Sequence, residues 1–572
     1  MAKQSMESGV DISSELNLRP PARVMRLERM GAAFPTRISF MRSLIRRMHR
    51  ESWKIDRTLF QFDEKGFGRA VYSARGPDRT YSLVAFANPL DNDQRTDRVI
   101  AEAWDASFVL YDGEPKQNDI DRLAICTPRQ EAGRFEASEL VLSRANRSLR
   151  LFDYVCSSLS VGVQPEIERL KEVGYLMRTT AVYGNGKFGV GDRTRISDRP
   201  ELSGPFQAEM LAVYLIRCFT FDQVEHVARS VAPDRFVPLA RDRKRFLGIG
   251  NATGLGMAPF LVTHPELIHR WVYAREVALA RVRQILKASP EKINRFQELL
   301  ARTWQHLHEW WVDDSRQQRN ILADRSGIEV IIEWVSGSDS LLLSEDCPWD
   351  LLYAKTERAL SIETQELLVS LLLEIYPELV DDLESELSMN SCSNIDARQS
   401  LPELKSLIEK NYQWALEIDF ELPESQQHFW YTSENKLEPR YGNRQSEPGA
   451  EQEMPLAIGR DVKSLYQQLA KKKHSPLLAE FLLTCPQYRY VVRRVQVSEA
   501  HPYGEIQDNL VGHECRPLDL LRYKLAFFGA SKFDPKSSLW TRITLFQGAP
   551  LPDEIECEEA SDWSFSIAPS ER

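Results

Sequence analysis

The chain has 572 residues, 42% of them hydrophobic and 27% charged, as in ordinary globular proteins. Its formal net charge of −10 argues against a dominant nucleic-acid-binding face, which would need a basic surface. The sequence has no long apolar run for a membrane span, no apolar core for a secretory signal, and no CxxC pair for a zinc ribbon. Its eight dispersed cysteines suit a reducing compartment, so we expect a cytoplasmic protein.

Composition and charge divide the chain into five predicted segments. They are a disordered N-terminus over residues 1–18, a basic helical segment over 19–54, a mixed α/β domain over 55–345, an α+β domain over 346–550 and an acidic, loose tail over 551–572. The basic segment most simply packs against the acidic remainder of the chain, burying Phe34, Phe40, Met41, Leu44, Ile45 and Met48. The alternative is that this segment docks a partner protein or nucleic acid.

The first half of the chain alternates strand and helix signals. Apolar runs separated by turn residues predict a three-stranded antiparallel meander within residues 58–88. We expect helices over 95–113, 165–174 and 206–219, with a strand over 175–183. Asp222 and Glu225 have the spacing of a capping box, which predicts a further helix start.

The second half is mostly helical in pattern. Thr263, Pro265 and Glu266 form a helix-start signature. We expect helices over 267–286, 294–311 and 361–380, strands over 328–334, 486–497 and 539–547, and a long polar loop over 432–454. Residues 518–529 fit either a helix or a strand. The predicted fold is mixed α and β (α+β or α/β), predominantly helical, with an N-terminal antiparallel β-meander.

Two glycine clusters are the clearest local feature. One contains Gly184, Gly186, Gly189 and Gly191, and the other contains Gly248, Gly250, Gly254 and Gly256. The first includes GxGxxG, but no helix pattern follows at once, as a dinucleotide site requires. It also lacks the valine of a kinase glycine loop and the Ser or Thr of a Walker loop. The clusters therefore match no named phosphate-binding motif.

Glycine-rich backbone next to positive charge still suits an anion. Consecutive backbone N–H groups form anion-binding concavities, and short polar side chains add donors. The predicted binding residues are Arg178, Gly184, Gly186, Lys187, Gly189, Arg193, Arg245, Gly248, Gly250, Asn251 and Thr253. This pattern predicts a pocket for a small phosphate- or carboxylate-bearing molecule, with the two clusters close together. The alternative is a pair of tight structural loops.

Acid–base candidates come from the C-terminal part. The segment 501–515 contains His501, Glu505 and His513, which could act as general acid and base, with His226 in reserve. Their spacing matches no metal-ligand motif, and the sequence implies no particular cofactor. We expect structural roles for His306 and His308. The leading hypothesis is an enzyme acting on a small anionic substrate, and the alternative is a non-catalytic ligand-binding or scaffold protein.

Overall fold

The chain forms two compact units, each assembled from distant stretches of sequence. The computed structural model describes residues 16–91, 93–95, 103–128, 136–181, 198–254, 264–337, 340–344, 346–388, 394–420, 422, 429–432, 439–441, 453–455, 458–471, 477–507, 517–536, 540–557 and 562–570. Unit 1 comprises Met1–Phe34, Leu255–Ile293 and Trp334–Lys524, and unit 2 comprises Pro35–Gly254, Asn294–Glu333 and Leu525–Arg572. These boundaries differ from the consecutive ones drawn from composition. Most of the predicted disordered N-terminus, residues 1–15, lies outside the described residues.

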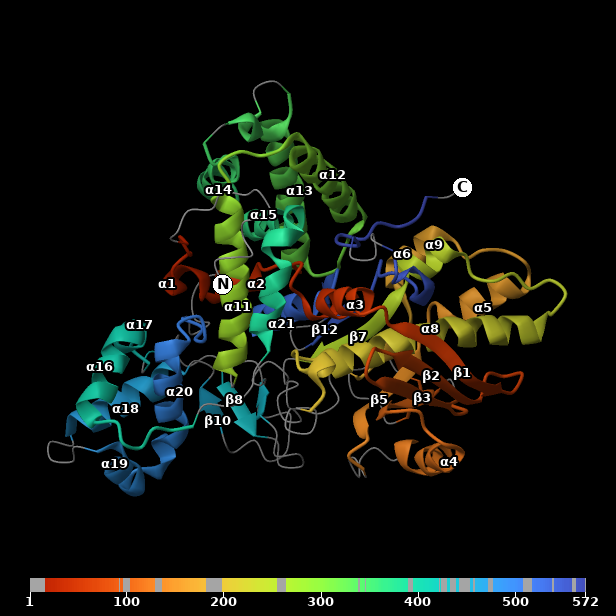
Figure 1. Ribbon diagram of the computed structural model, residues 1–572, viewed down its shortest axis with the longest axis horizontal. Helices are drawn as coiled ribbons and strands as arrows, with labels where there is room; N and C mark the ends of the chain where they lie inside the picture. Colours follow the sequence, from red (N-terminus) through yellow and green to blue (C-terminus); the bar gives the residue numbers. More distant parts are fainter. Residues whose placement is uncertain are drawn as a thin grey trace. The chain divides into compact units, whose positions relative to one another are not determined.

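A nine-stranded sheet is the frame of unit 2 (Figure 1). In sheet order, its strands are β1 (Lys54–Phe62), β2 (Gly68–Arg75), β3 (Thr80–Ala87), β4 (Ala106–Asp112), β5 (Glu139–Arg147), β6 (Tyr175–Thr179), β7 (Gly248–Gly254), β12 (Trp540–Leu545) and β11 (Phe533–Pro535). Every neighbouring pair is antiparallel except β6 and β7. The predicted antiparallel meander is confirmed and continues into β4, within a predominantly helical α+β fold.

Helix α8 (Gln207–Val231) is the crossover that joins the parallel strands β6 and β7. It contacts β2 through β7, and its Phe219 packs against Phe108 at a ring distance of 5.3 Å. On the opposite face, α4 (Gln117–Cys126) packs Leu123 against Val109. The predicted helix start at Asp222 and Glu225 is wrong, because α8 runs through both residues.

The described part of the second glycine cluster forms a strand rather than the predicted loop. Residues 248–254 form β7, between β6 and β12. A Cβ atom at Gly250 would lie 2.6 Å from the ring of Tyr175, and one at Gly248 would lie 2.3 Å from the carbonyl oxygen of Leu545. These two glycines therefore permit close packing between strands. Gly256 lies outside the described residues.

Three predicted elements have the wrong type, and burial explains each error. Residues 106–112 of the predicted helix 95–113 form β4, whose faces are both buried, so its apolar residues run continuously rather than alternate. The predicted strand 328–334 belongs to α13 (Ser315–Val335), which buries Ile328, Ile331 and Val335 at helical spacing. The predicted strand 486–497 lies mostly in α20 (Arg489–Ala500), where packing overrides the strand preference of valine.

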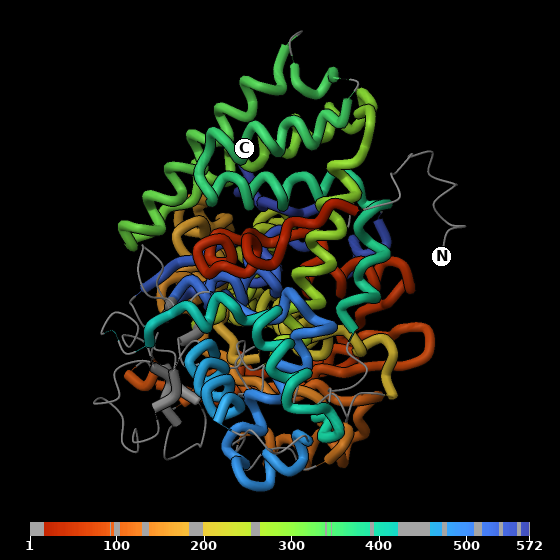
Figure 2. The backbone as a smooth tube through the Cα atoms, turned by 90° about the vertical axis from the view of Figure 1, so that its left-hand side faces the viewer, coloured from red at the N-terminus to blue at the C-terminus, as the bar shows by residue number. Residues whose placement is uncertain are grey.

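Unit 1 is built from helices. Its main helices are α11 (Pro265–Arg283), α14 (Pro348–Ala359), α15 (Ile362–Ile375), α16 (Leu401–Asn411), α18 (Gly459–Lys471), α19 (Leu478–Thr484), α20 and most of α21 (Pro517–Phe528). Helices α16, α18, α19 and α20 lie close together (Figure 2), and their buried side chains form one hydrophobic core. The predicted loop 432–454 contains β9 (Pro439–Tyr441), which pairs with β8 (Phe429–Thr432), as does β10 (Glu453–Pro455). No helix among the described residues is long and apolar enough to cross a membrane.

The basic segment forms α1 (Pro21–Val24), α2 (Leu27–Gly31) and α3 (Phe40–Arg50). The six apolar side chains predicted to anchor it are all buried: Phe34, Phe40, Met41, Leu44, Ile45 and Met48. The predicted loose tail is wrong for its described part, because Ile555 and Trp563 are also buried. The described parts of the basic segment and of the C-terminal tail therefore both contribute buried side chains to the fold.

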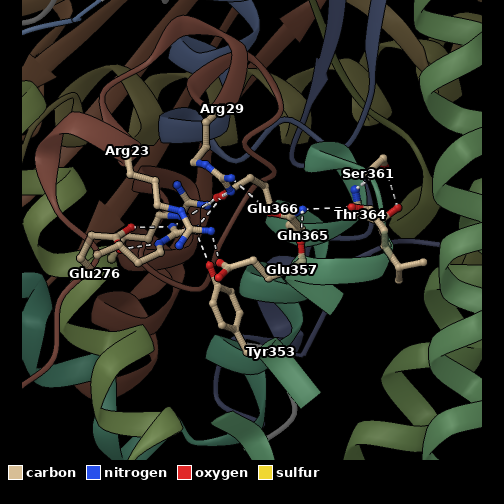
Figure 3. A network of polar contacts seen from close by, with 12 residues as sticks. Arg23, Arg29, Glu276, Tyr353, Glu357, Ser361, Thr364, Gln365 and Glu366 are labelled. Carbon is tan, nitrogen blue, oxygen red and sulfur yellow. Dashed lines mark hydrogen bonds and ion pairs between the residues drawn. The ribbon is translucent and has the colours of Figure 1, made fainter. Parts of the chain in front are cut away.

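A buried ion cluster fastens the start of this segment within unit 1 (Figure 3). The Glu366 carboxylate of α15 accepts hydrogen bonds from Arg19 at 2.7 Å, from Arg29 at 2.6 Å and from Arg275. Arg19 also donates two hydrogen bonds of 2.7 Å to Glu276. Burial alone raises the pKa of Glu366, but the three arginines outweigh burial and hold this pKa well below its usual range.

Replacing Gly250 with alanine should destabilise unit 2 by about 1–3 kcal/mol, because the new Cβ atom overlaps the Tyr175 ring. The measurement is the free energy of unfolding by denaturant titration. Gly204→Ala is the control, since its Cβ atom would meet only side-chain atoms of Gln207, the nearest at 3.0 Å, and no ring or backbone atom. Equal stability of the two variants would contradict this explanation of the glycine.

The variant Glu366→Gln should lose about 3–5 kcal/mol of stability at pH 7, because it leaves buried arginines without their shared carboxylate. The carboxylate stabilises the fold above its unfolded pKa of about 4.3, and this contribution is lost as the pH falls below that value. The variant's stability should therefore vary less with pH below about 4.3 than that of the original protein. Glu357→Gln, at the half-buried pair with Arg23, is the control and should lose at most about 1 kcal/mol.

Candidate functional site

Unit 2 contains a pocket of about 560 Å³ beside β1 and α8. This volume lies within the range of roughly 300–1,000 Å³ that is usual for small-molecule sites. Its walls come from the start of β1, from β2, α8 and α9 (Arg241–Phe246), and from residues 551–556. The lining residues are Trp53, Lys54, Ile55, Arg57, Tyr72, Arg217, Cys218, Phe221, Asp222, Arg241, Lys244, Leu551, Pro552, Asp553 and Glu556.

Aromatic side chains form the rigid part of the wall. Trp53 is buried, stacks on Tyr81 at a ring distance of 6.1 Å and donates its indole N–H to Glu51 at 2.8 Å. Phe221 lines the pocket from α8. These rings offer a flat apolar surface whose position is fixed by packing.

The carboxylate of Asp222 is held by two donors. The Tyr72 hydroxyl donates to it at 2.7 Å, and Arg57 pairs with it at 3.0 Å. Burial, together with Asp222, raises the pKa of Tyr72 well above its usual value. Tyr72 therefore stays protonated at neutral pH. Its hydrogen bond to Asp222 links β2 to α8, the two elements that form this part of the pocket wall.

Arg217 differs from the other cations of the wall because it is fully buried and donates to carbonyl oxygens. Its guanidinium is fully buried and donates to the carbonyl oxygens of Leu247 at 2.8 Å, Lys244 at 2.9 Å and Ala549 at 3.1 Å. It also donates to the carbonyls of Arg245 and Pro550. In the described part of the chain, its hydrogen-bond acceptors are thus all neutral carbonyls. Burial lowers the pKa of Arg217, as expected for a cation removed from water.

Helix α9 contributes part of the basic run that precedes the second glycine cluster. Lys244 pairs with Glu225 at 2.6 Å, and Arg241 pairs with Asp553 at 2.6 Å on the exposed rim. Both side chains line the pocket. Arg245, one of the predicted binding residues, does not line it and donates to the Gly548 carbonyl at 3.3 Å.

Cys218 has little nucleophilic character in this setting. Its thiol donates to the Tyr214 carbonyl at 3.4 Å, and burial raises its pKa to about 12. Because the thiolate is the reactive form of cysteine, the thiol at this position is inert at neutral pH.

The predicted glycine-cluster site is only partly described. Gly184, Gly186, Lys187, Gly189 and Arg193 lie outside the described residues, as does the side chain of Thr253. Arg178 is buried in β6, in register with Gly250 of β7. Asn251 is also buried and donates to the Thr179 carbonyl at 3.0 Å, which links the two strands. The proximity of the two clusters stays a prediction.

The predicted acid–base residues belong to unit 1, whereas β6, β7 and α9 belong to unit 2. Glu505 is buried and forms a bidentate pair with Arg494, at 2.7 and 2.6 Å. His501 donates to the Val497 carbonyl at 2.9 Å, and His513 lies outside the described residues. The described contacts of His501 and Glu505 are therefore those of structural residues.

Three other histidines that the sequence singles out make backbone contacts that fit structural roles. His306 donates to the Ser566 carbonyl at 2.7 Å, His308 contacts the Trp304 carbonyl at 2.7 Å, and His226 contacts the Asp63 carbonyl at 2.7 Å. Sequence reasoning missed Trp53, Tyr72 and Arg217 as pocket residues. The spacing of Asp222 and Glu225 predicts a helix cap, whereas in the structure Asp222 lines the pocket and Glu225 pairs with Lys244.

Native protein treated with iodoacetamide at pH 7.5 should remain unmodified at Cys218 while the exposed Cys557 is alkylated. A thiol with a pKa of about 12 is ionised in fewer than roughly one molecule in ten thousand at this pH. Peptide mass spectrometry after timed quenching measures both rates, and denatured protein is the control in which both cysteines should react. Comparable rates in the native protein would show that the Cys218 thiol is not held as described.

The sequence matches no protein-family model and no curated protein, and the fold matches no solved structure. Function must therefore be inferred from the residues of the pocket and their chemistry.

Proposed function

We propose that the protein binds a small molecule that combines an anionic group with a flat apolar body in the pocket of unit 2. The observation that carries this proposal is Arg217, a fully buried cation of the pocket wall whose described hydrogen-bond acceptors are neutral carbonyls. A buried charge is costly without a counter-charge. An anion bound in the pocket would attract the charge of Arg217. This attraction would offset part of that cost, because the buried wall has a low dielectric constant.

The rest of the wall supports the same ligand class. Five basic side chains and three acidic ones line the pocket, so the wall has an excess of positive charge. Each nitrogen of the Arg217 guanidinium already donates to a carbonyl, so Arg217 would act on a ligand mainly through its charge. Lys54, which is exposed, and Lys244 are the side chains placed to contact an anion directly. Trp53 and Phe221 would hold the apolar body.

Binding is better supported than catalysis for the described groups. Asp222 is engaged by Tyr72 and Arg57, and the Tyr72 and Cys218 side chains remain protonated at neutral pH. A general acid or base works best with a pKa near the operating pH. We therefore place the non-catalytic ligand-binding function first.

The second candidate is the enzyme hypothesis, with its anion site at the glycine clusters. The supporting observation is the parallel pairing of β6 and β7, whose carboxyl ends lie at one edge of the sheet. Residues 182–191 follow soon after β6, and Gly256 follows β7. Ligands of α/β folds often bind outside the carboxyl ends of parallel strands.

A thermal-shift screen can test both candidates. Nucleoside monophosphates and aromatic carboxylates should raise the melting temperature, while the matching nucleosides and aromatic amides should do so much less. Lys244→Gln should weaken binding of the best anion by about tenfold in calorimetry, the usual effect of losing one charge-assisted contact. Ile55→Phe should also weaken binding, because its larger ring would fill part of the pocket.

The control for charge is Lys171→Gln, which removes a cation of unit 2 that pairs with Glu168 on α6 (Ile167–Val173). This variant should bind normally. Loss of binding in Lys187→Gln, with normal binding in Lys244→Gln, would move the site to the first glycine cluster. Equal stabilisation by charged and neutral ligands would reject the anion site in the pocket.

A further inference from the structure

We propose that unit 2 has a second ligand site, for a compact oxyanion such as phosphate or a carboxylate, beneath its C-terminal segment. A pocket of about 540 Å³ lies between α9, α12 (Pro290–Glu309) and residues 562–570. It shares no lining residue with the pocket of the proposed function. The two proposals therefore stand on separate residues.

The C-terminal segment is held on α12 by four hydrogen bonds, which involve three of its residues. Asp562 accepts hydrogen bonds from Arg295 at 2.6 Å and Arg302 at 3.0 Å. The Ser566 carbonyl accepts from His306, and the backbone N–H of Ala568 donates to Glu309 at 3.0 Å. These contacts use one carboxylate and the backbone of the segment, and they leave its other polar side chains available.

Those side chains are buried donors that line the pocket. The indole Nε1 of Trp563 and the hydroxyls of Ser564 and Ser566 have no hydrogen-bond partner among the described residues. Ser566 is 9% exposed and Trp563 is 7% exposed. Leaving a buried donor unsatisfied is costly, and native proteins pair most such groups with protein, water or ligand atoms.

The opposite wall carries the guanidinium of Arg245, which also pairs with Glu554 at 3.9 Å, and it is fixed in place. Arg245 and Gly548 exchange two hydrogen bonds, one from the Gly548 N–H at 2.9 Å and one from Arg245 Nε at 3.3 Å. Gly548 has a φ of +83°, and a Cβ atom there would lie 2.6 Å from Cβ of Ser566. This turn therefore brings Arg245 and Ser566 to the same pocket.

The hydrogen-bonding chemistry selects the ligand class. Indole and guanidinium groups only donate, so a ligand that satisfies them must present acceptor atoms. The carboxylate of Asp562 is already engaged by two arginines, and Asp242 accepts from the Arg243 N–H at 2.8 Å. Phosphate and carboxylate groups provide several acceptors in a small volume, and charge-assisted bonds to them are strong.

The decisive variant is Ser564→Ala/Ser566→Ala, tested by calorimetry at constant ionic strength with inorganic phosphate and, separately, with acetate. Removal of both hydroxyls should weaken binding of the preferred anion by about tenfold or more. The melting temperature without added anion should not fall, because no protein hydrogen bond is lost. Ser157→Ala, which removes an exposed hydroxyl of α5 (Phe152–Ser160), is the control and should bind normally.

Trp563→Phe provides an independent check, since it removes the indole donor and keeps a ring to stack on Phe546. It should also weaken binding of the preferred anion. Preference for phosphate or for acetate would identify the kind of oxyanion. The proposal is overturned if the original protein binds neither anion, if the serine variant binds both normally, or if that variant is destabilised without anion.

Discussion

The guanidinium of Arg217 joins the segments from which both pockets of unit 2 are built. It projects from α8 and binds carbonyls at the end of α9 and at residues 549–550. The carbonyls at the end of a helix have no partners within the helix, so Arg217 completes α9 as a C-terminal cap. Residues 551–556 then line one pocket, while Gly548 and Arg245 line the other. The positions of both sites thus depend on one buried side chain.

The glycine clusters illustrate what composition can and cannot show. A cluster of glycines requires either positive φ angles or the close approach of another group. The sequence cannot distinguish a ligand from a neighbouring strand as that group. For Gly248 and Gly250 the neighbours are Leu545 and Tyr175, which are remote in sequence. Only the sheet order, with β7 between β6 and β12, reveals this cause.

Local pattern predicted much of the fold but little of the pocket. The meander and helices α11 and α15 follow from apolar periodicity and capping residues. Elements buried on several sides, such as β4, lose the periodicity that identifies them. Pocket residues such as Trp53 and Arg217 have no shared motif, because β1, α8 and α9 come together only through the sheet and the crossover helix. Among the sequence patterns, only the basic residues of α9 point to the pocket, which Arg241 and Lys244 line.

The buried arginines of the Glu366 cluster in unit 1 and the buried Arg217 of unit 2 are satisfied in different ways, and this contrast bears on function. In unit 1, Arg19, Arg29 and Arg275 share the carboxylates of Glu366 and Glu276, so most of their charge is neutralised within the unit. Such a cluster can hold a segment in place without a ligand. In unit 2, Arg217 is equally buried but is satisfied by dipoles of neutral carbonyls, which stabilise its N–H groups without cancelling its charge. The field of that charge extends into the adjoining pocket, where an anion would gain from it.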